Sequence, residues 1–357
     1  MKKKISTQIK KRIKKEKGKK VKLWSPPEGT NRFLISTGSL LVDLAISGRR
    51  FLYGGIPMGI FCEIFGASGR GKTVILLEMA GDCDRQGGDY LFIDPEARVN
   101  KYFAKIFDFD LNNDKYKKPS TPEEAFSLIK NWKPKGEGPY CIFLDGLAAL
   151  VSREEEAGKG DEYSGARKAK EFSQEFRQIC RLLEEKDYLF VATNQIRQNL
   201  GAAVFAKKTK STGGEAPKFY ASLRLELLTP PTEGKIVVQK TIKGVKHKES
   251  IGVTTNVFVE KSSISVPYKT GSMRILFDYG IDSITTNLVF IKKNTKSTVY
   301  TLRGEGIGNS IDKAVKYIEH PKPKVMKKRM RLLRKDVLEL WTEIQKHFVP
   351  DRKRKLR

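Results

Sequence analysis

The feature that most constrains the fold is the segment GASGRGKT at Gly66–Thr73. It fits the pattern G-x-x-x-x-G-K-[ST] and lies between an apolar run at 59–66 and a segment of helical periodicity at 74–86. A strand, a glycine-rich turn and a helix in this order form a phosphate-binding loop, because the turn and the helix start direct backbone N–H groups at one anion. The pattern therefore predicts an α/β domain built around this loop.

We assign ATP and Mg²⁺ as the ligands of this loop. Its glycines allow the backbone to bend around phosphate oxygens, and the helix dipole adds a favourable field. We expect Lys72 to contact the β- and γ-phosphates and to be needed for catalysis, and Thr73 to coordinate Mg²⁺. The residues assigned to ATP binding are Gly66, Ala67, Ser68, Gly69, Arg70, Gly71, Lys72 and Thr73.

Apolar runs and helical patterns alternate along the chain. The runs lie at 89–94, 140–150 and 188–196, and the helical patterns lie at 122–132 and 169–187. This alternation predicts a mostly parallel sheet flanked by helices. After residue 215 the pattern changes to hairpin-like strands, which begin with FYASLRLELL at 219–228.

We divide the chain into three parts. Residues 1–34 are a basic segment with an isoleucine at every fourth position from Ile5 to Ile13, which predicts a short amphipathic helix. Residues 35–282 form the ATPase core, and residues 283–357 form a small, basic, mixed α/β domain.

Two predicted strands are followed by carboxylates. Asp145 comes after the run YCIFL, where it can hold Mg²⁺, and Glu96 follows the run at 89–94, where it can orient the attacking water. Asp94 shares this second strand end. Carboxylates at strand ends also cap turns, and the sequence leaves this alternative open for all three.

The net charge of +28 is concentrated at the two ends of the chain. Residues 1–23 contain twelve Lys/Arg and one Glu, and residues 322–357 contain fourteen Lys/Arg and four acidic residues. Such ends attract a polyanion, most often nucleic acid, although they are also compatible with solvated tails. The chain has no apolar run long enough to span a membrane and no signal-peptide pattern, so we expect no membrane partner and a cytoplasmic location.

The sequence resembles the RecA family of DNA recombinases, bacterial RecA and its phage counterparts. The matching segments are ISTGS (35–39), GIPMG (55–59), the phosphate-binding loop, FIDPE (92–96), FLDGLAAL (143–150), NQIR (194–197), STGGEAPKFYASLRLEL (211–227) and GEGIG (304–308). They follow the family order from about residue 34 to residue 320. The basic C-terminus departs from the acidic tail that is usual in bacterial RecA.

The resemblance implies a DNA-dependent ATPase that polymerises on single-stranded DNA and pairs it with homologous duplex in recombination and repair. The implied partners are single- and double-stranded DNA, further copies of the chain in a helical filament, and single-strand-binding and mediator proteins. The N-terminal segment would serve oligomerisation. The protein would be associated with DNA in the cytoplasm, or in the host cytoplasm if it is phage-encoded.

The resemblance also implies the residues that contact DNA, in a first loop at 152–165, a second loop at 198–218 and the helix after the first loop. They are Ser164, Gly165, Lys170, Ser173, Arg177, Arg197, Leu200, Gly213 and Gly214. The spacing of Lys170, Ser173 and Arg177 places them on one helical face, which would otherwise be a solvated basic face. The glycine pair allows backbone N–H groups to approach phosphates, and Leu200 can wedge between bases.

Four further roles come from the resemblance. Gln195 would sense the γ-phosphate and move the second loop, and Phe219 would pass this signal to the neighbouring subunit rather than fill a core. Lys261 would complete the neighbour's catalytic site, where Ser263 stands in place of a second lysine. Either that lysine is missing, or another residue such as Lys243, Lys246 or Lys248 compensates. Phe103 aligns with a residue that stacks on adenine.

Two other functions stay open. A replicative helicase with a RecA-like fold should carry an arginine in place of Lys261 and lack the second loop. A recombination mediator or paralogue would bind DNA and hydrolyse ATP poorly, and Ser263 slightly favours this alternative.

Overall fold

The computed structural model describes residues 33–349 and residue 352, apart from residues 108, 110, 112–113, 152–163, 199–208, 212–214 and 231–233. The predicted helix at Ile5–Ile13 lies outside the described residues. Within the described part, no helix has the length and apolar character needed to cross a membrane.

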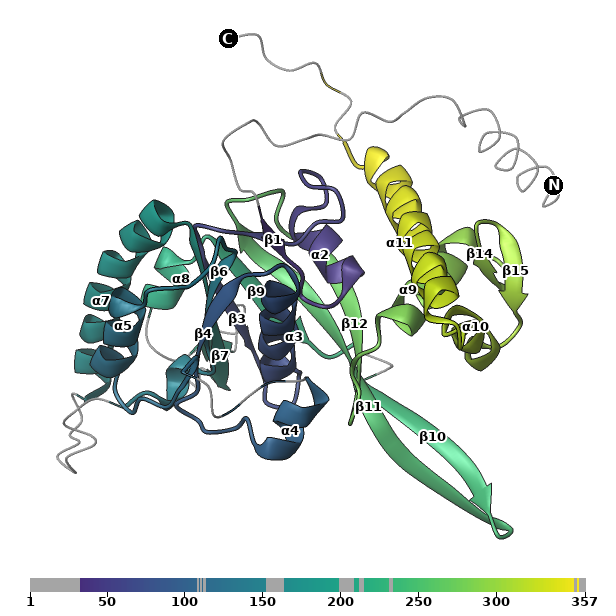
Figure 1. Cartoon of the computed structure of the whole chain (residues 1–357), viewed down its shortest axis with the longest axis horizontal. Helices are drawn as coiled ribbons and strands as arrows, with labels where there is room; N and C mark the ends of the chain where they lie inside the picture. The colour runs from purple at the N-terminus through teal and green to yellow at the C-terminus, as the bar shows by residue number, and fades with distance from the viewer. Residues whose placement is uncertain are drawn as a thin grey trace.

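A central sheet of eleven strands forms the body of the molecule (Figure 1). Its strand order is β13-β12-β11-β9-β3-β7-β6-β4-β5, with β8 beside β7 and β10 beside β11. The strands are β3 (Phe61–Gly66), β4 (Asp89–Ile93), β5 (Tyr116–Lys117), β6 (Tyr140–Leu144), β7 (Tyr188–Gln198), β8 (Thr209–Ser211), β9 (Leu223–Leu228), β10 (Lys235–Ile242), β11 (Val245–Ser262), β12 (Thr270–Leu276) and β13 (Gly280–Ile281). The six strands from β9 to β5 are parallel to their neighbours in this order, and β11, β12 and β13 pair antiparallel. The predicted α/β fold with a mostly parallel sheet is confirmed.

Helices cover both faces of the parallel strands, because successive side chains of a strand point to opposite faces. In β6, Cys141 and Phe143 pack with helix α3 (Lys72–Arg85) in one hydrophobic core. Ile142 and Leu144 pack in a second core with α5 (Pro122–Asn131) and α7 (Ser164–Lys186). Strands that are apolar on both sides therefore lie at the centre of the sheet.

Local sequence signals fix where several helices begin. The Thr121 side chain accepts a hydrogen bond from the N–H of Glu124, whose carboxylate accepts in return from the N–H of Thr121. This reciprocal capping, with Pro122 in the first turn, starts α5. Asn100 caps α4 (Lys101–Ile106) by accepting from the N–H of Phe103 at 2.9 Å.

One segment predicted as a strand is partly helical. Residues 216–220 form the short helix α8 (Ala216–Tyr220), and the strand β9 begins only at Leu223. Pro217 lies in the first turn of α8, where its missing N–H costs nothing, and its fixed φ suits a helix start. This proline indicates a helix start, which the alternation of apolar residues after it made hard to recognise.

The C-terminal residues form a small mixed α/β unit. It contains α9 (Ser283–Thr295), β14 (Tyr300–Leu302), β15 (Glu305–Gly308), α10 (Ile311–Ile318) and α11 (Pro323–Lys346). Its apolar core includes Leu333, Val337 and Trp341 and is shared with Leu44 from α2 (Leu40–Ser47). Because α2 precedes the phosphate-binding loop, this shared core ties the C-terminal unit to the start of the ATPase core. The predicted boundary at residue 283 stays a prediction.

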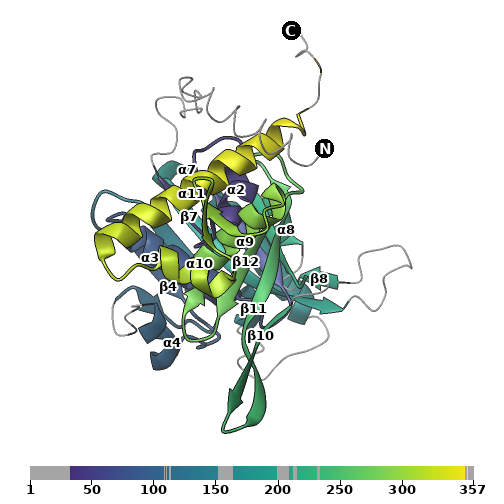
Figure 2. The same ribbon diagram turned by 90° about the vertical axis from the view of Figure 1, so that its right-hand side faces the viewer.

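A two-stranded ribbon projects from the sheet (Figures 1 and 2). It consists of β10 and the first part of β11, which pair antiparallel from Lys235↔Val253 to Ile242↔Val245. Lys243 and Gly244 form its turn, with φ values of 50° and 81°. Positive φ at both turn residues matches the twist of a tight hairpin.

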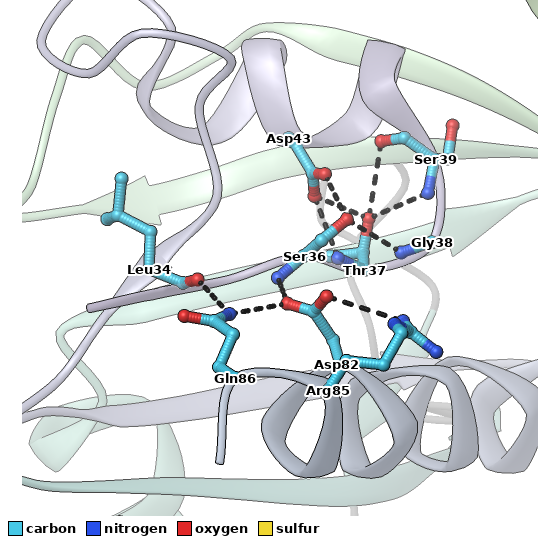
Figure 3. A network of polar contacts seen from close by, with 9 residues as sticks. All are labelled: Leu34, Ser36, Thr37, Gly38, Ser39, Asp43, Asp82, Arg85 and Gln86. Carbon is cyan, nitrogen blue, oxygen red and sulfur yellow. Dashed lines mark hydrogen bonds and ion pairs between the residues drawn. The ribbon is translucent and has the colours of Figure 1, made fainter. Parts of the chain in front are cut away.

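A buried polar network joins the ISTGS segment to α2 and α3 (Figure 3). The carboxylate of Asp43 accepts hydrogen bonds from the Ser36 hydroxyl at 2.5 Å and from the N–H and hydroxyl of Thr37 at 2.8 and 2.7 Å. Asp82 of α3 accepts from the N–H of Ser36 at 2.9 Å. The network therefore holds the entry of the chain against the helix that follows the phosphate-binding loop.

Asp43 predicts a measurable pH dependence of stability. Burial raises the pKa of Asp43 to about 6, against an ordinary value of 3.8. The folded state then holds a proton that the unfolded state has lost, so this contribution is present below about pH 4 and is lost as the pH rises through about 6. At one pKa unit per 1.36 kcal/mol, the free energy of unfolding should fall by about 3 kcal/mol from this residue.

Denaturant titrations at pH 4, 5, 6 and 7 measure this contribution in wild type and in Asp43→Asn. The variant should lack that part of the pH dependence, whereas Asp312→Asn, at an exposed site in α10, should keep it. Parallel pH profiles for wild type and Asp43→Asn would contradict the prediction.

Candidate functional site

The site lies where the carboxyl ends of four parallel strands meet. β3 ends at Gly66, which pairs in register with Gln195 of β7. β4 and β6 end beside them, and the N–H of Asp145 donates to the carbonyl of Ile93 at 2.8 Å. Loops at this edge of an α/β sheet are the usual place for a ligand. The topology thus brings Glu96, Asp145 and Gln195 to the edge of the sheet where the phosphate-binding loop lies.

The loop Gly66–Thr73 joins β3 to α3, and α3 begins at Lys72. Gly69 and Gly71 have φ values of 70° and 87°, in the left-handed region that favours glycine. A Cβ on Gly71 would lie 2.1 Å from the Cδ1 of Ile275, so a side chain there would also require Ile275 to shift. The hydroxyl of Thr255 in β11 donates to the carbonyl of Arg70 at 3.2 Å and ties the loop to the antiparallel part of the sheet.

Lys72 points back over its own loop. Its Nζ donates to the carbonyls of Gly66 at 3.0 Å and Ala67 at 2.9 Å. Burial lowers the pKa of Lys72, and the negative charge of Asp145 acts in the opposite direction. The cation is therefore held at the point on which the loop and the helix start converge.

Thr73 and Asp145 are in direct contact. The Thr73 hydroxyl donates to Oδ2 of Asp145 at 2.5 Å, and the Thr193 hydroxyl donates to Oδ1 at 2.6 Å. Burial raises the pKa of Asp145, while these two hydrogen bonds lower it. A hydroxyl and a buried carboxylate side by side are the oxygen donors that suit Mg²⁺. The residues present therefore fit the predicted metal, and Thr193 is a neighbour that the sequence analysis did not identify.

Asp94 has a structural role in the loop after β4. Its buried carboxylate accepts from the N–H groups of Arg98 at 3.3 Å and Val99 at 3.0 Å, and from the Tyr116 hydroxyl at 2.6 Å. Hydrogen bonds to two backbone N–H groups fix the loop 94–99 in one conformation. The alternative that a strand-end carboxylate caps a turn is thus correct for Asp94.

Glu96 lies between the side chains of Gln195 and Arg98. Its Oε1 accepts from Nε2 of Gln195 at 3.1 Å, and its Oε2 forms an ion pair with Nε of Arg98. The residue expected to orient water and the residue expected to sense the γ-phosphate are therefore in contact. Arg98 was missed in the sequence, although it lies only two positions after Glu96.

A cavity of about 240 Å³ opens beside the loop. Its lining includes Gly69, Lys72, Thr73, Arg98, Phe103 and Ile275. Phe103 packs partly against the core and lies 5.5 Å from Phe107 between ring centroids. The structure thus brings Phe103 into the same cavity as Lys72 and Thr73.

A buried charge network lies beneath Gln195, and the sequence analysis did not identify it. Nε of Arg224 donates to Oε2 of Glu63 at 2.6 Å, and Nη1 of Arg224 pairs with Glu260. Nδ2 of Asn194 donates to Oε1 of Glu63 at 2.9 Å. The network crosses β3, β7, β9 and β11. It links the residue before Gln195 to the residue before Lys261.

Lys261 and Phe219 lie together on another part of the surface. Nζ of Lys261 donates to the carbonyls of Lys218 at 3.1 Å and Phe219 at 2.9 Å, at the end of α8. Burial lowers the pKa of Lys261, and the nearby Arg224 charge lowers it further. The Phe219 side chain is 74% exposed, so the alternative of a core aromatic is wrong. Neither residue lines the cavity beside the phosphate-binding loop.

The residues expected to contact DNA are only partly described. Lys170 and Arg177 are exposed and Ser173 is half-buried on α7, opposite the buried Phe172 and Phe176. Ser164 and Gly165 were expected in the first loop and instead belong to the first turn of α7. Leu200, Gly213 and Gly214 lie outside the described residues.

The second loop has more regular structure than the sequence suggested. β7 continues to Gln198, and β8 pairs with it antiparallel, so that Arg197 is opposite Lys210. Two basic residues therefore lie at one register position of a short ribbon. With α8, these elements occupy both ends of the segment predicted as a loop at 198–218.

Comparisons with known proteins agree with this geometry. The chain matches the family described as the RecA N-terminal domain over residues 3–282. It is 32% identical over 292 residues to Protein RecA of Delftia acidovorans (strain DSM 14801 / SPH-1), covering 80% of this chain and 74% of that protein. Identity to Protein RecA of Colwellia psychrerythraea (strain 34H / ATCC BAA-681) is 32% over 296 residues, with coverages of 80% and 79%. Identity to Protein RecA of Acholeplasma laidlawii is 30% over 301 residues, with coverages of 82% and 84%. The family match contains every cavity residue named above.

Proposed function

The chain belongs to the RecA family, and we propose that it is an ATP-dependent DNA recombinase. It would polymerise on single-stranded DNA and pair that strand with homologous duplex in recombination and repair. The observation that carries this proposal is the contact between Glu96 and Gln195 beside the phosphate-binding loop. Through this contact, the carboxylate proposed to activate water is hydrogen-bonded to β7, the strand that leads into the second loop.

The ATPase step follows from the positions of these side chains. Lys72 and the N–H groups of its loop bind the β- and γ-phosphates, and Glu96 orients a water. The water oxygen bonds to the γ-phosphorus, the bond to the bridging oxygen breaks, and ADP leaves. The proton of the water passes through Glu96 to the released phosphate. Thr73 and Asp145 would hold Mg²⁺, which neutralises phosphate charge when bound.

Gln195 would connect the nucleotide to DNA. Its amide can bond either to Glu96 or to the terminal phosphate, and it lies on the strand that continues to Arg197 and the second loop. A change of partner at Gln195 therefore biases the conformation of that loop. Lys170, Ser173 and Arg177 would bind the DNA backbone. Lys261 donates a hydrogen bond to the carbonyl of Phe219, and both residues would face the next subunit of a filament.

Two alternatives make different predictions for the same assays. A RecA-fold helicase would unwind duplex DNA and would need a cation of another geometry at the position of Lys261. A mediator or paralogue would bind DNA with little ATP turnover, as the serine at Ser263 would allow. Thr73 contacts Asp145 and Glu96 contacts Gln195 beside the phosphate-binding loop, which favours an ATP-hydrolysing recombinase over the mediator.

One experiment separates the three functions. The ATPase rate is measured with and without single-stranded DNA, alongside a D-loop assay with homologous and heterologous duplex. The recombinase should show DNA-stimulated hydrolysis and D-loops that depend on homology. Stimulated hydrolysis with unwinding but without D-loops would favour the helicase. DNA binding with no stimulated hydrolysis would favour the mediator.

The C-terminal helix allows a separate prediction about duplex DNA. Deleting residues 322–357 is not a clean test, because α11 buries Leu333, Val337 and Trp341 in the core. The exposed cations near its start can instead be neutralised by substituting glutamine at four positions. These are Lys324, Lys327, Lys328 and Arg331. Neutralisation should weaken duplex binding at any sequence and change single-strand binding less.

Salt dependence gives the measurement. The slope of log K against log salt should become shallower by about 0.9 for each DNA phosphate that the variant no longer neutralises. A matched control neutralises four exposed lysines elsewhere, namely Lys101, Lys105, Lys133 and Lys135. An unchanged slope in the α11 variant, or an equal change in the control, would show that the cations of α11 are only solvated.

A further inference from the structure

Arg98 is a cation of the nucleotide cavity with no role in the function proposed above. Its side chain is 44% exposed and lines the cavity together with Gly69, Lys72 and Thr73. Its charge also lowers the pKa of Lys72, which indicates that the two cations are close. The guanidinium therefore lies at the phosphate end of the cavity, on the side of Glu96.

The position of Arg98 is set by buried groups. The carboxylate of Asp94, with 0% exposure, accepts from the N–H groups of Arg98 and Val99. Ala97 has a φ of 50°, in the left-handed region, and its N–H donates to the carbonyl of Asp94 at 3.2 Å. Hydrogen bonds to Asp94 thus fix a turn that places Arg98 at the cavity with Glu96 beside it.

Glu96 is held on both of its oxygens. Gln195 donates to Oε1 at 3.1 Å, and Arg98 pairs with Oε2 through Nε. An oxygen that is paired with a guanidinium is a poor acceptor for the proton of a water. The contact that positions Arg98 therefore also competes with the catalytic role given to Glu96.

We propose that Arg98 binds the terminal phosphate of ATP and exchanges its partner Glu96 for that phosphate. A guanidinium has a planar array of donors that matches phosphate oxygens. ADP lacks the γ-phosphate, so the Arg98–Glu96 pair persists with ADP and opens only with ATP. Oε2 of Glu96 then accepts from water. This inference rests on the proposed ATPase function.

The exchange of partners would let Arg98 affect hydrolysis in two ways. It adds positive charge where negative charge develops during phosphoryl transfer, as an arginine supplied within the same chain does in other nucleotide hydrolases. It also makes release of the carboxylate depend on the presence of the triphosphate. Hydrolysis would be coupled to recognition of the phosphate that is to be removed.

The first test is nucleotide binding without turnover. Isothermal titration with Mg²⁺ and either ADP or a non-hydrolysable ATP analogue is carried out on the full chain. Arg98→Ala should weaken binding of the ATP analogue by roughly ten- to hundredfold, which is the range for the removal of a hydrogen bond to a charged group. It should change ADP affinity by less than about twofold. Arg98→Lys keeps the charge without the planar array of donors, so its affinity for the analogue should lie between those of wild type and Arg98→Ala.

The control is Arg85→Ala. Arg85 also pairs with a carboxylate, Asp82, but its side chain is 63% exposed and lies at the far end of α3 from the cavity. This variant should bind both nucleotides like the wild type.

The second test asks whether Glu96 and Arg98 compete. Glu96→Gln removes the carboxylate that holds the guanidinium, so it should increase the affinity for the analogue several-fold relative to the affinity for ADP. The gain should vanish when Arg98→Ala is also present. A double-mutant cycle measures this coupling, which two independent contributions would not produce.

The outcomes distinguish this inference from the proposed function. If wild type binds the analogue and hydrolyses ATP while Arg98→Ala binds it equally well, Arg98 is only the ion-pair partner of Glu96. Equal losses for ADP and analogue would show a general effect of charge or folding and would also overturn the exchange. If wild type neither binds the analogue nor hydrolyses ATP, both the function and the role of Arg98 are wrong.

Discussion

Replacing Glu96 by glutamine is expected to lower the rate of ATP hydrolysis by about 10²–10⁴-fold, the range for removal of a general base. Nucleotide binding should persist, because Lys72, Thr73 and the loop glycines are unchanged. Glutamine keeps the shape of the side chain and its contact with Gln195, but it cannot accept the proton of a water. The protein should therefore accumulate in the ATP-bound form.

Two measurements check this expectation. Steady-state hydrolysis gives the rate, and a filter-binding assay with labelled ATP shows whether nucleotide is still held. Glu305→Gln, at an exposed position in β15, is the matched control and should hydrolyse ATP normally. Near wild-type turnover in Glu96→Gln would mean that another group activates the water.

Removing the buried cation of Arg224 should have the largest effect on stability. Arg224 is 4% exposed and pairs with Glu63, which is fully buried. Arg224→Met would leave the Glu63 carboxylate in the sheet without its cation, which typically costs about 3–5 kcal/mol. The aliphatic side chain can keep the packing against Phe65, whose ring centroid lies 4.3 Å from the guanidinium carbon.

The free energy of unfolding, from urea titration at neutral pH, measures this cost. The double variant Arg224→Met with Glu63→Gln should recover at least half of the loss, because the uncompensated charge is gone. Arg85→Met, which breaks an exposed ion pair with Asp82, should cost at most about 1 kcal/mol. If Arg224→Met costs no more than this control, the network does not contribute to stability as inferred.

The phosphate end of the site could be predicted from the sequence because local spacing determines it. The Gly66–Thr73 pattern fixes a turn and a helix start, and both are present. Asp145 and Glu96 each follow a predicted strand, and parallel strands bring their ends to one edge. No long-range information beyond the parallel pairing was needed to place Glu96 and Asp145 near Lys72, whereas Gln195 was identified only from the family resemblance.

Some of the residues that were missed depend on pairing between distant segments, unlike Arg98. Arg224 meets Glu63 only because β9 pairs with β3, and the register Glu63↔Arg224 is invisible in either segment alone. Likewise, the contact of Lys261 with the end of α8 requires the antiparallel pairing of β11 with β9. The α7 start at Ser164 was missed for another reason: the polar residues before it have no apolar period that marks a helix boundary.

The ribbon of β10 and β11 has a consequence for how copies of this protein can crowd together without aggregating. β11 pairs with β12 only from Gly252 onward, so the ribbon leaves the outer edge of β10 and the edge of β11 at 245–251 without a partner strand in the described sheet. Open edges invite another strand, and exposed apolar side chains such as Ile242 and Val245 add to that hazard. Lys240, Lys246 and Lys248 place like charges along the same edges. In the proposed filament, this repulsion would oppose the joining of strands from different subunits into one sheet.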